Sequence, residues 1–304
     1  MYNTAPPLLG QNINSPAYWL SLNPKMSISD FPFKQSSPLD VSIQVIGNSL
    51  QQVKSEGYFQ TQPVIDNESM SRLATAVQAV VRAGLPAVFA FVYDEYWALA
   101  GSIRPIVEPI LGEAYLLSPG DMWIWHVDER GLSSGWGPHR DLQDTSTIRP
   151  DGLPRIITIW VPLTDATTLN GCMYLLPKHL DPNYPENLND RAVSVAALQN
   201  IRALPADAGS ILGWAPTVLH WGSRHSKKPV GPRISVAYYL NDGGHDHGCG
   251  ISTRADTYVP LWYRLGVIGA MINLFDGSPL ASDLKFPPEL KALLQPFLDQ
   301  VAPR

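Results

Sequence analysis

The stretch with the clearest chemical content is GWGPHRD, residues 135–141. Residues two apart in an extended chain project from the same face, so His139 and Asp141 would present an imidazole and a carboxylate to one point. A nitrogen and a carboxylate oxygen on one edge supply two of the three ligands of a facial metal triad. This pair alone is a weak signal, because WHVDE contains a second pair of the same kind, His126 and Asp128.

A third ligand has to come from a distant part of the chain, and His220 is the candidate. It ends the apolar strand expected in 209–223, where a histidine is costly unless its polar edge is used. The alternative is a core histidine bonded to a backbone carbonyl. Further on, Arg233 opens the apolar strand RISVAYYL, and a buried arginine needs an anionic partner. Its planar fork suits a carboxylate, either that of a ligand or that of an internal Asp.

In this order, the motifs resemble the phytanoyl-CoA dioxygenase-like family of Fe(II)/2-oxoglutarate-dependent dioxygenases. The stretch 158–180, TIWVPLTDATTLNGCMYLLPKHL, is similar to that family's aromatic strand, its D-A-T…N-G turn and its P-x-x-H exit. The stretch 208–239, which begins AGSILGWAPTVLHWGS, resembles the family's distal-histidine strand. The resemblance extends over residues 40–240 and is most specific over 135–239.

The resemblance implies a set of ligands and cofactors. His139, Asp141 and His220 match the family's iron ligands, and Arg233 matches the arginine that holds the far carboxylate of 2-oxoglutarate. The implied cofactor is Fe(II), with 2-oxoglutarate and O2 as co-substrates and ascorbate as an optional reductant. Halogenating relatives carry a small residue in place of the carboxylate, so Asp141 excludes that branch of the family.

Two further residues are assigned by the resemblance. Trp160 falls where the family has an aromatic side chain lining the co-substrate pocket, and Ser235 completes an Arg-x-Ser pattern of related oxygenases. The chain departs from the family directly after the distal histidine, where Trp221 precedes the usual glycine, Gly222. This departure concerns the loop beside the co-substrate and not the triad.

The function implied is oxidation, in the simplest case hydroxylation, of a small-molecule metabolite, with succinate and CO2 as co-products. Two alternatives stay open: a β-barrel protein that binds a small molecule without turnover, and a cupin-type metalloenzyme that does not use 2-oxoglutarate. An intact triad together with Arg233 favours the dioxygenase. The tryptophans expected near the cavity mouth suit a hydrophobic or ring-containing molecule, which we favour over an acyl-CoA; they are Trp123, Trp125, Trp136 and Trp221.

Two other clusters are less convincing as metal sites. His126 and Asp128 lie too far ahead of the aromatic strand at 155–163 to match the family's spacing. The cluster His245–Asp246–His247–Gly248–Cys249 has the residue types of a zinc site but lacks a second ligand pair at zinc-finger spacing, so we expect a polar loop.

The composition narrows the class of protein. Of the 304 residues, 45% are apolar and 16% are charged, which excludes a disordered chain. A formal charge of −5 argues against nucleic acid as the main partner, because phosphate binding needs a clustered basic surface. We find no apolar run of membrane-spanning length, no signal-peptide pattern at the start and no disulfide framework. We therefore expect a cytoplasmic protein with a small-molecule substrate; the oligomeric state stays open.

The remaining pattern concerns the elements that must position these residues. Residues 1–37 are rich in Pro, Ser and Asn and predict an irregular arm, and 38–304 predict a single domain. Apolar residues at helical spacing predict helices ending near Gly57 and Gly84, whereas 85–112 suggests broken helix and loop. Short β-branched or aromatic runs predict strands at 113–118, 122–127, 155–163, 172–177, 209–214 and 233–240.

Several such strands in succession favour a sandwich or barrel over a parallel sheet. Together with the resemblance, they imply a mainly β protein with α: a double-stranded β-helix, which is a distorted, cupin-like jelly roll. Its β core would span about 113–240, with the N-terminal helices packed on one sheet. After the core, residues 258–300 contain an apolar run and a charged helix.

Overall fold

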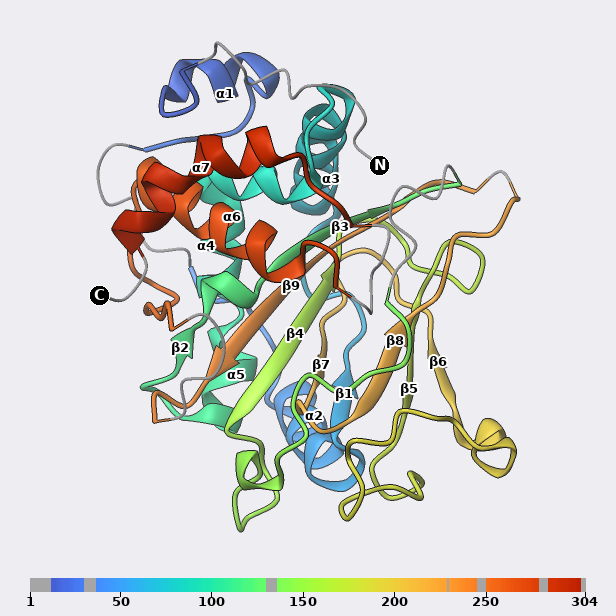
Figure 1. Cartoon of the computed structure of the whole chain (residues 1–304). Helices are drawn as coiled ribbons and strands as arrows, with labels where there is room; N and C mark the ends of the chain where they lie inside the picture. Colours follow the sequence, from blue (N-terminus) through green and yellow to red (C-terminus); the bar gives the residue numbers. More distant parts are fainter. Residues whose placement is uncertain are drawn as a thin grey trace.

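The larger of two antiparallel sheets runs through the centre of the computed structural model (Figure 1). The model describes residues 12–29, 37–129, 136–228, 230–244, 250–278 and 284–301. In the larger sheet the strand order is β1–β7–β4–β9–β2, and β3 also pairs with β9. The bounds are Tyr58–Gln60 for β1, Leu116–Leu117 for β2, Trp123–Val127 for β3, Ile156–Pro162 for β4, Leu212–Trp214 for β7 and Arg233–Asn241 for β9.

The smaller sheet has the order β6–β5–β8. Its strands are β5 (Met173–Leu176), β6 (Arg202–Leu204) and β8 (Leu219–Gly222). In Figure 1 this sheet lies beside the β1–β7 edge of the larger one. The two sheets form the predicted double-stranded β-helix.

The alternation of side chains along the central strands gives the larger sheet two different faces. On β4, Ile157 and Ile159 join the main apolar core, whereas Thr158 and Trp160 line a cavity. On β9, Val236 and its alternate neighbours point to the same core. The sequence pattern of these strands is almost continuously apolar because both faces are covered.

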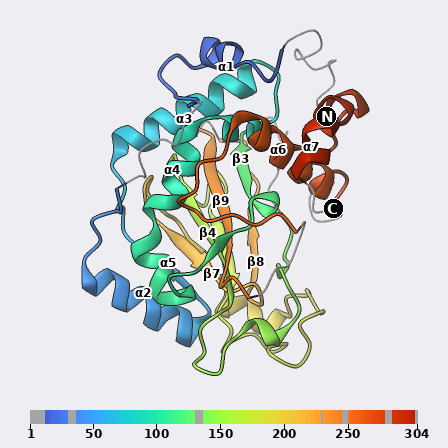
Figure 2. The same cartoon turned by 90° about the vertical axis from the view of Figure 1, so that its left-hand side faces the viewer.

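Helices cover the core face of the larger sheet (Figure 2). They are α1 (Pro16–Leu22), α2 (Ile43–Glu56), α3 (Asn67–Arg82), α4 (Asp94–Ser102), α5 (Arg104–Leu111), α6 (Leu261–Phe275) and α7 (Pro288–Val301). A hydroxyl on the sheet ties the layers together, since Tyr238 Oη donates to the carbonyl of Tyr96 on α4 at 2.7 Å. The prediction of N-terminal helices packed on one sheet is confirmed.

The helix ends follow the local sequence. Asp66 caps α3 by accepting a hydrogen bond from the backbone N–H of Ser69 at 2.8 Å. Gly57 ends α2 with a φ of 85°, a left-handed conformation in which glycine lacks the steric penalty of other residues. A Cβ at this position would lie 2.6 Å from the side chain of Val218, so glycine is also required by space.

Three stretches differ from the sequence prediction. The N-terminal arm, predicted as irregular, contains α1, whose Trp19 is fully buried and stacks on Phe89. Residues 85–112 hold a buried 3-10 turn at Ala87–Val92 as well as α4 and α5. In the 3-10 turn and in α4 most residues are buried, which removes the one-sided apolar stripe by which a surface helix is recognised.

The third difference concerns the distal histidine. The apolar stretch 209–223 is not one strand: β7 ends at Trp214, the chain turns, and His220 lies on β8 in the other sheet. A turn hydrogen bond from the N–H of Val218 to the carbonyl of Ala215 closes this connection at 3.0 Å. Within the described residues, no helix is both long and apolar enough to cross a membrane.

Candidate metal centre

A backbone bridge brings the two histidines of the candidate site together. The N–H of His139 donates to the carbonyl of His220 at 3.0 Å, and the N–H of His220 donates back at 2.9 Å. The loop that follows β3 is thereby joined to β8 of the smaller sheet. The imidazole ring centres lie 4.3 Å apart, and both residues are buried.

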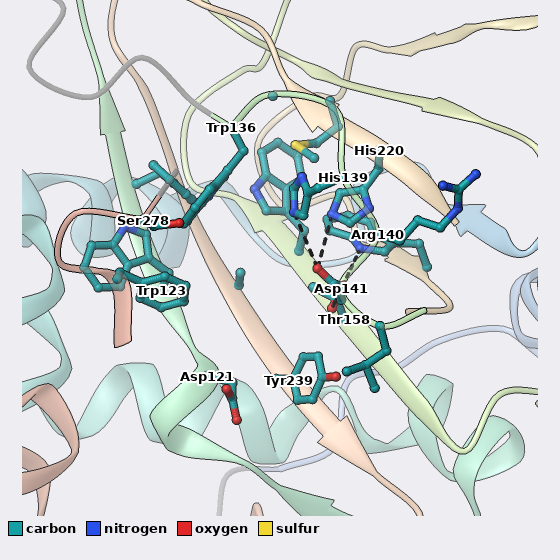
Figure 3. Close-up of a pocket in the computed structure, with 18 of the residues that line it drawn as sticks. Asp121, Trp123, Trp136, His139, Arg140, Asp141, Thr158, His220, Tyr239 and Ser278 are labelled. Carbon is teal, nitrogen blue, oxygen red and sulfur yellow. Dashed lines mark hydrogen bonds and ion pairs between the residues drawn. The ribbon is translucent and has the colours of Figure 1, made fainter. Parts of the chain in front are cut away.

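Asp141 completes a three-sided cluster with these rings (Figure 3). Its Oδ1 lies 3.6 Å from Nε2 of His139 and 3.5 Å from Nε2 of His220. One ligand atom from each of the three residues lies within 4.8 Å of the other two. Among the residues that the structure describes, this is the one group of His, Cys, Asp and Glu side chains with such geometry.

The hydrogen bond made by Nδ1 of each imidazole fixes the tautomer and the orientation of the ring. Nδ1 of His139 lies 2.8 Å from the carbonyl of Gly137, and Nδ1 of His220 lies 3.0 Å from that of Val218. A carbonyl can only accept, so each Nδ1 carries the proton and each Nε2 keeps its lone pair toward the cluster. Histidines that ligate metals are held in this manner.

The pKa values of Asp141 and His220 favour the protonation states in which these residues bind a cation. Burial opposes the charge on Asp141, but His220, His139 and the Thr158 hydroxyl stabilise it, and the pKa falls to about 2. Burial lowers the pKa of His220 to about 4, against the opposing pull of Asp141. Near neutral pH the cluster therefore contains a carboxylate and an uncharged distal imidazole, the forms in which both residues ligate a metal ion.

Two residues that sequence reasoning missed hold the second oxygen of Asp141. Thr158 Oγ1 on β4 donates to Oδ2 at 2.8 Å, and Trp214 Nε1 on β7 donates to the same atom at 3.2 Å. The Trp214 ring also lies 4.7 Å from the His220 ring, centre to centre. These contacts leave Oδ1 facing the histidines, so the orientation of the carboxylate is set by two strands of the larger sheet.

Arg140, between two of the candidate ligands, anchors the loop that carries them. It is 2% exposed and pairs with the buried carboxylate of Asp181. Its Nη1 also donates to the carbonyls of Leu188 at 3.0 Å and of Asp190 at 2.5 Å. In Figure 3 its side chain points away from Asp141. The pair fixes the candidate metal-binding loop to the segment 181–190.

Arg233 carries a buried charge without a carboxylate partner among the described residues. Arg233 is 1% exposed, and its Nη1 donates to Ser235 Oγ at 2.8 Å. Its Nε has no hydrogen-bond partner among the residues that the structure describes. The guanidinium carbon lies 5.7 Å from the ring centre of Trp160. Burial lowers the pKa of Arg233 to about 10, which still leaves it cationic near neutral pH.

The triad and Arg233 line one cavity of about 420 Å³. Thr158, Trp160 and Trp214 line the same space, because the period of two places them on the inner face of the larger sheet. Trp136 lies beside the triad, with 5.8 Å between its ring centre and that of His139, and Trp123 lies farther along the cavity (Figure 3). A metal ion held by three side chains at this position would keep its remaining coordination sites toward the cavity, as in the facial triads of non-haem iron enzymes.

Comparison with known proteins shows the family to which part of the chain belongs. The model of the phytanoyl-CoA dioxygenase (PhyH) family matches residues 85–229. This segment belongs to the phytanoyl-CoA dioxygenase family. A search of curated proteins found no match to the chain. The family segment includes the three triad residues, whereas Arg233 and helices α6 and α7 follow it.

Solved structures share the fold at low sequence identity. The epimerase SnoN from nogalamycin biosynthesis, described as non-haem and alpha-ketoglutarate dependent, is 16% identical, with 66% of this chain and 82% of that chain covered at a TM-score of 0.52. The non-haem monooxygenase ThoJ is 14% identical, with 69% and 84% covered at 0.52. Apo HygX from Streptomyces hygroscopicus is 12% identical, with 66% and 88% covered at 0.50. At these identities the likeness shows the phytanoyl-CoA dioxygenase-like fold.

The structure separates the two His-x-Asp pairs of the family segment. On β3 the cavity-lining Trp123 and Trp125 alternate with His126, which therefore projects from the opposite face. His126 and Asp128 line a different depression, together with Arg82 of α3. Neither residue lines the triad cavity. The predicted polar loop at 245–249 lies outside the described residues.

Of the four tryptophans expected near the mouth, three line the cavity: Trp123, Trp125 and Trp136. Trp221 is elsewhere. It stacks on Tyr174 of β5 with 5.8 Å between the ring centres. Residues adjacent in a strand point to opposite faces, so Trp221 and the candidate ligand His220 cannot both face the cavity.

Proposed function

We propose that this protein is an Fe(II)/2-oxoglutarate-dependent dioxygenase that hydroxylates a small-molecule substrate. The observation that carries the proposal is the buried Arg233 in the same cavity as the triad. A buried guanidinium is costly unless an anion pairs with it, and none of the carboxylates in the described part of the chain does so. The far carboxylate of 2-oxoglutarate would supply that anion from outside.

In this proposal each side chain has a distinct task. His139, Asp141 and His220 would hold the iron, and Thr158 and Trp214 would keep the second oxygen of Asp141 turned away from it. Iron with 2-oxoglutarate and O2 supplies the oxidising power; the co-substrate leaves as succinate and CO2, and one oxygen atom of O2 becomes the new hydroxyl.

Three residues would bind and position 2-oxoglutarate at one end of the cavity. Arg233 would pair bidentately with the far carboxylate, because its planar fork matches that group. Ser235 accepts from one arm of the fork and limits its rotation. Trp160 lies close enough for a cation–π contact with the guanidinium and would form the side of the pocket.

The same observation argues against both alternatives. A protein that only binds a small molecule has no need of two imidazoles whose Nε2 lone pairs converge beside a carboxylate. A cupin-type metalloenzyme without 2-oxoglutarate has no need of the buried cation.

We also propose that 38–304 is one domain, because Arg264 of α6 pairs at 2.6 Å with Asp94, the first residue of α4.

Release of succinate tests the proposed function. Purified protein with Fe(II), ascorbate and 2-oxoglutarate should form succinate slowly in the absence of its own substrate, and His139→Ala should abolish this. Protein shown to contain iron but forming succinate only at the no-enzyme rate would support the binding-protein alternative. Hydroxylation itself is tested on the substrate: incorporation of labelled oxygen from O2 supports it, and an isomerised product without that oxygen would overturn it.

A further inference from the structure

One side of the cavity is a continuous wall of aromatic rings that begins beside the triad. Trp136 lies 5.8 Å from the His139 ring, 5.2 Å from Trp125 and 5.3 Å from Phe275, centre to centre. Phe275 in turn lies 4.7 Å from Trp123. These neighbours meet edge to face, the arrangement that aromatic rings favour over a face-to-face sandwich. The wall thus extends from a candidate metal ligand to the far end of the cavity.

Part of this wall lies outside the family segment. Leu274 and Phe275, at the end of α6, and Ser278, just after it, line the cavity although the family match ends at residue 229. Helix α6 is fixed in place by Arg264, which is fully buried and donates to the carbonyls of Val92 and Val259 at 2.7 and 2.8 Å. Helix α6 is therefore a fixed part of the cavity lining as well as of the core.

The polar lining of the cavity does not suit a phosphorylated substrate. Arg140 is engaged by Asp181 and two carbonyls, and Arg233 is buried at the proposed co-substrate end. Among the described lining residues this leaves Arg191 as the one further cation, against Asp121 on the same lining. A nucleotide-bearing thioester needs several cations for its phosphates, so this cavity is a poor match for an acyl-CoA.

The lining also offers a hydrogen-bonding group to an incoming molecule. Tyr239 lies opposite Thr158 in the β4–β9 pairing, and its ring points into the cavity (Figure 3). Its hydroxyl has no protein partner within the described residues. Burial and the nearby carboxylates raise the pKa of Tyr239, so the hydroxyl keeps its proton and can donate to a substrate oxygen.

We propose that the aromatic wall of Trp123, Trp125, Trp136 and Phe275 binds a compact, ring-bearing hydrophobic molecule without phosphate groups, and that α6 is part of the substrate site. The reaction of that molecule rests on the proposed function, whereas its binding to the wall does not. A flat ring can stack on or meet the edges of several wall residues at once, which a flexible chain achieves only by losing conformational freedom.

Calorimetric titration with two probes of similar hydrophobicity, 2-naphthol and octan-1-ol, tests the inference on Fe(II)- and 2-oxoglutarate-loaded protein and on metal-free protein. We expect 2-naphthol to bind roughly tenfold more tightly than octan-1-ol, and Phe275→Ala to weaken 2-naphthol binding roughly tenfold. Phe275→Trp, which narrows the cavity without leaving a hole, should also weaken it. The matched control is Trp262→Ala on the same helix, because Trp262 is 38% exposed and away from the cavity.

Equal affinity for the two probes, or unchanged 2-naphthol binding in a folded Phe275→Trp protein, would overturn the inference. The succinate assay on the same preparations separates this from the proposed function. Succinate formation without a preference for 2-naphthol would contradict the ring site and support the dioxygenase. Phe275-dependent binding of 2-naphthol in protein that takes up neither iron nor 2-oxoglutarate would support the ring site and contradict the dioxygenase.

Discussion

Replacing Arg233 with glutamine separates a ligand-binding role of this residue from a structural one. The fall in the pKa of Arg233 from 12.5 to about 10, caused by burial, corresponds to about 3 kcal/mol by which the folded protein disfavours the charge. Removing a cation that is disfavoured and has no carboxylate partner among the described residues should not destabilise the protein. We therefore expect the Tm of Arg233→Gln without ligand to equal or exceed that of the parent.

The loss should be seen in 2-oxoglutarate binding. Breaking a buried, hydrogen-bonded ion pair from one side costs about 3–5 kcal/mol, or roughly two to four powers of ten in affinity. At a 2-oxoglutarate concentration that is 100 times the parental Kd, the parent gains about 2.7 kcal/mol of stability and the variant almost none. Arg233→Lys restores the charge but not the fork, so its loss should be intermediate.

Thermal unfolding with and without 2-oxoglutarate, iron content and the KM for 2-oxoglutarate should be measured on one preparation of each variant. Retained iron, an undiminished Tm and a greatly raised KM are expected of Arg233→Gln. An iron-loaded Arg233→Gln protein with near-normal KM would refute the co-substrate role. A large fall in Tm without ligand would show that the charge is satisfied within the protein, contrary to the reasoning from burial.

Three further changes probe other parts of the account. Asp141→Ala should abolish iron-dependent turnover while Asp128→Ala retains most of it, as measured by succinate release; the opposite order would move the metal site to the other pair. Arg140→Met should lower the free energy of unfolding by about 3–5 kcal/mol in a denaturant titration, because it leaves Asp181 buried without its cation; parental stability would contradict the anchoring role. Burial raises the pKa of Tyr238 well above 10, so the folded state holds this proton more tightly than the unfolded state, and stability should fall as pH rises above about 10. Tyr238→Phe should flatten that alkaline fall in Tm, and an unchanged slope would show that Tyr238 does not cause it.

The sequence predicted well those features of the fold that local patterns decide. The helix beginning at Asp66 has both a capping carboxylate and a one-sided apolar stripe, and α3 follows them. His139 and Asp141 converge as their spacing predicts, and the alternation along β3 turns His126 away from them. In each case the deciding interactions are between near neighbours in the chain.

The sequence could not show partners that only the tertiary fold brings together. Thr158 and Trp214 reach Asp141 from separate strands, and a tryptophan in an apolar run is equally typical of core packing. The anchoring role of Arg140 could not be predicted because its partner Asp181 is 41 residues further along the chain. The wall contributed by Phe275 was hidden for the same reason, since α6 is apolar on all sides and shows no face directed to a site.

The central claim is that one chain holds Fe(II) and 2-oxoglutarate together in the triad cavity, and an anaerobic titration tests it most directly. Adding 2-oxoglutarate to the Fe(II)-loaded protein should produce the weak visible charge-transfer band of the iron chelate, saturating at one equivalent per chain. Asp141→Ala should show no band at the same concentrations. Stoichiometric iron without the band would contradict the claim in favour of a metalloenzyme that does not use 2-oxoglutarate, and failure to retain iron would contradict the metal centre itself.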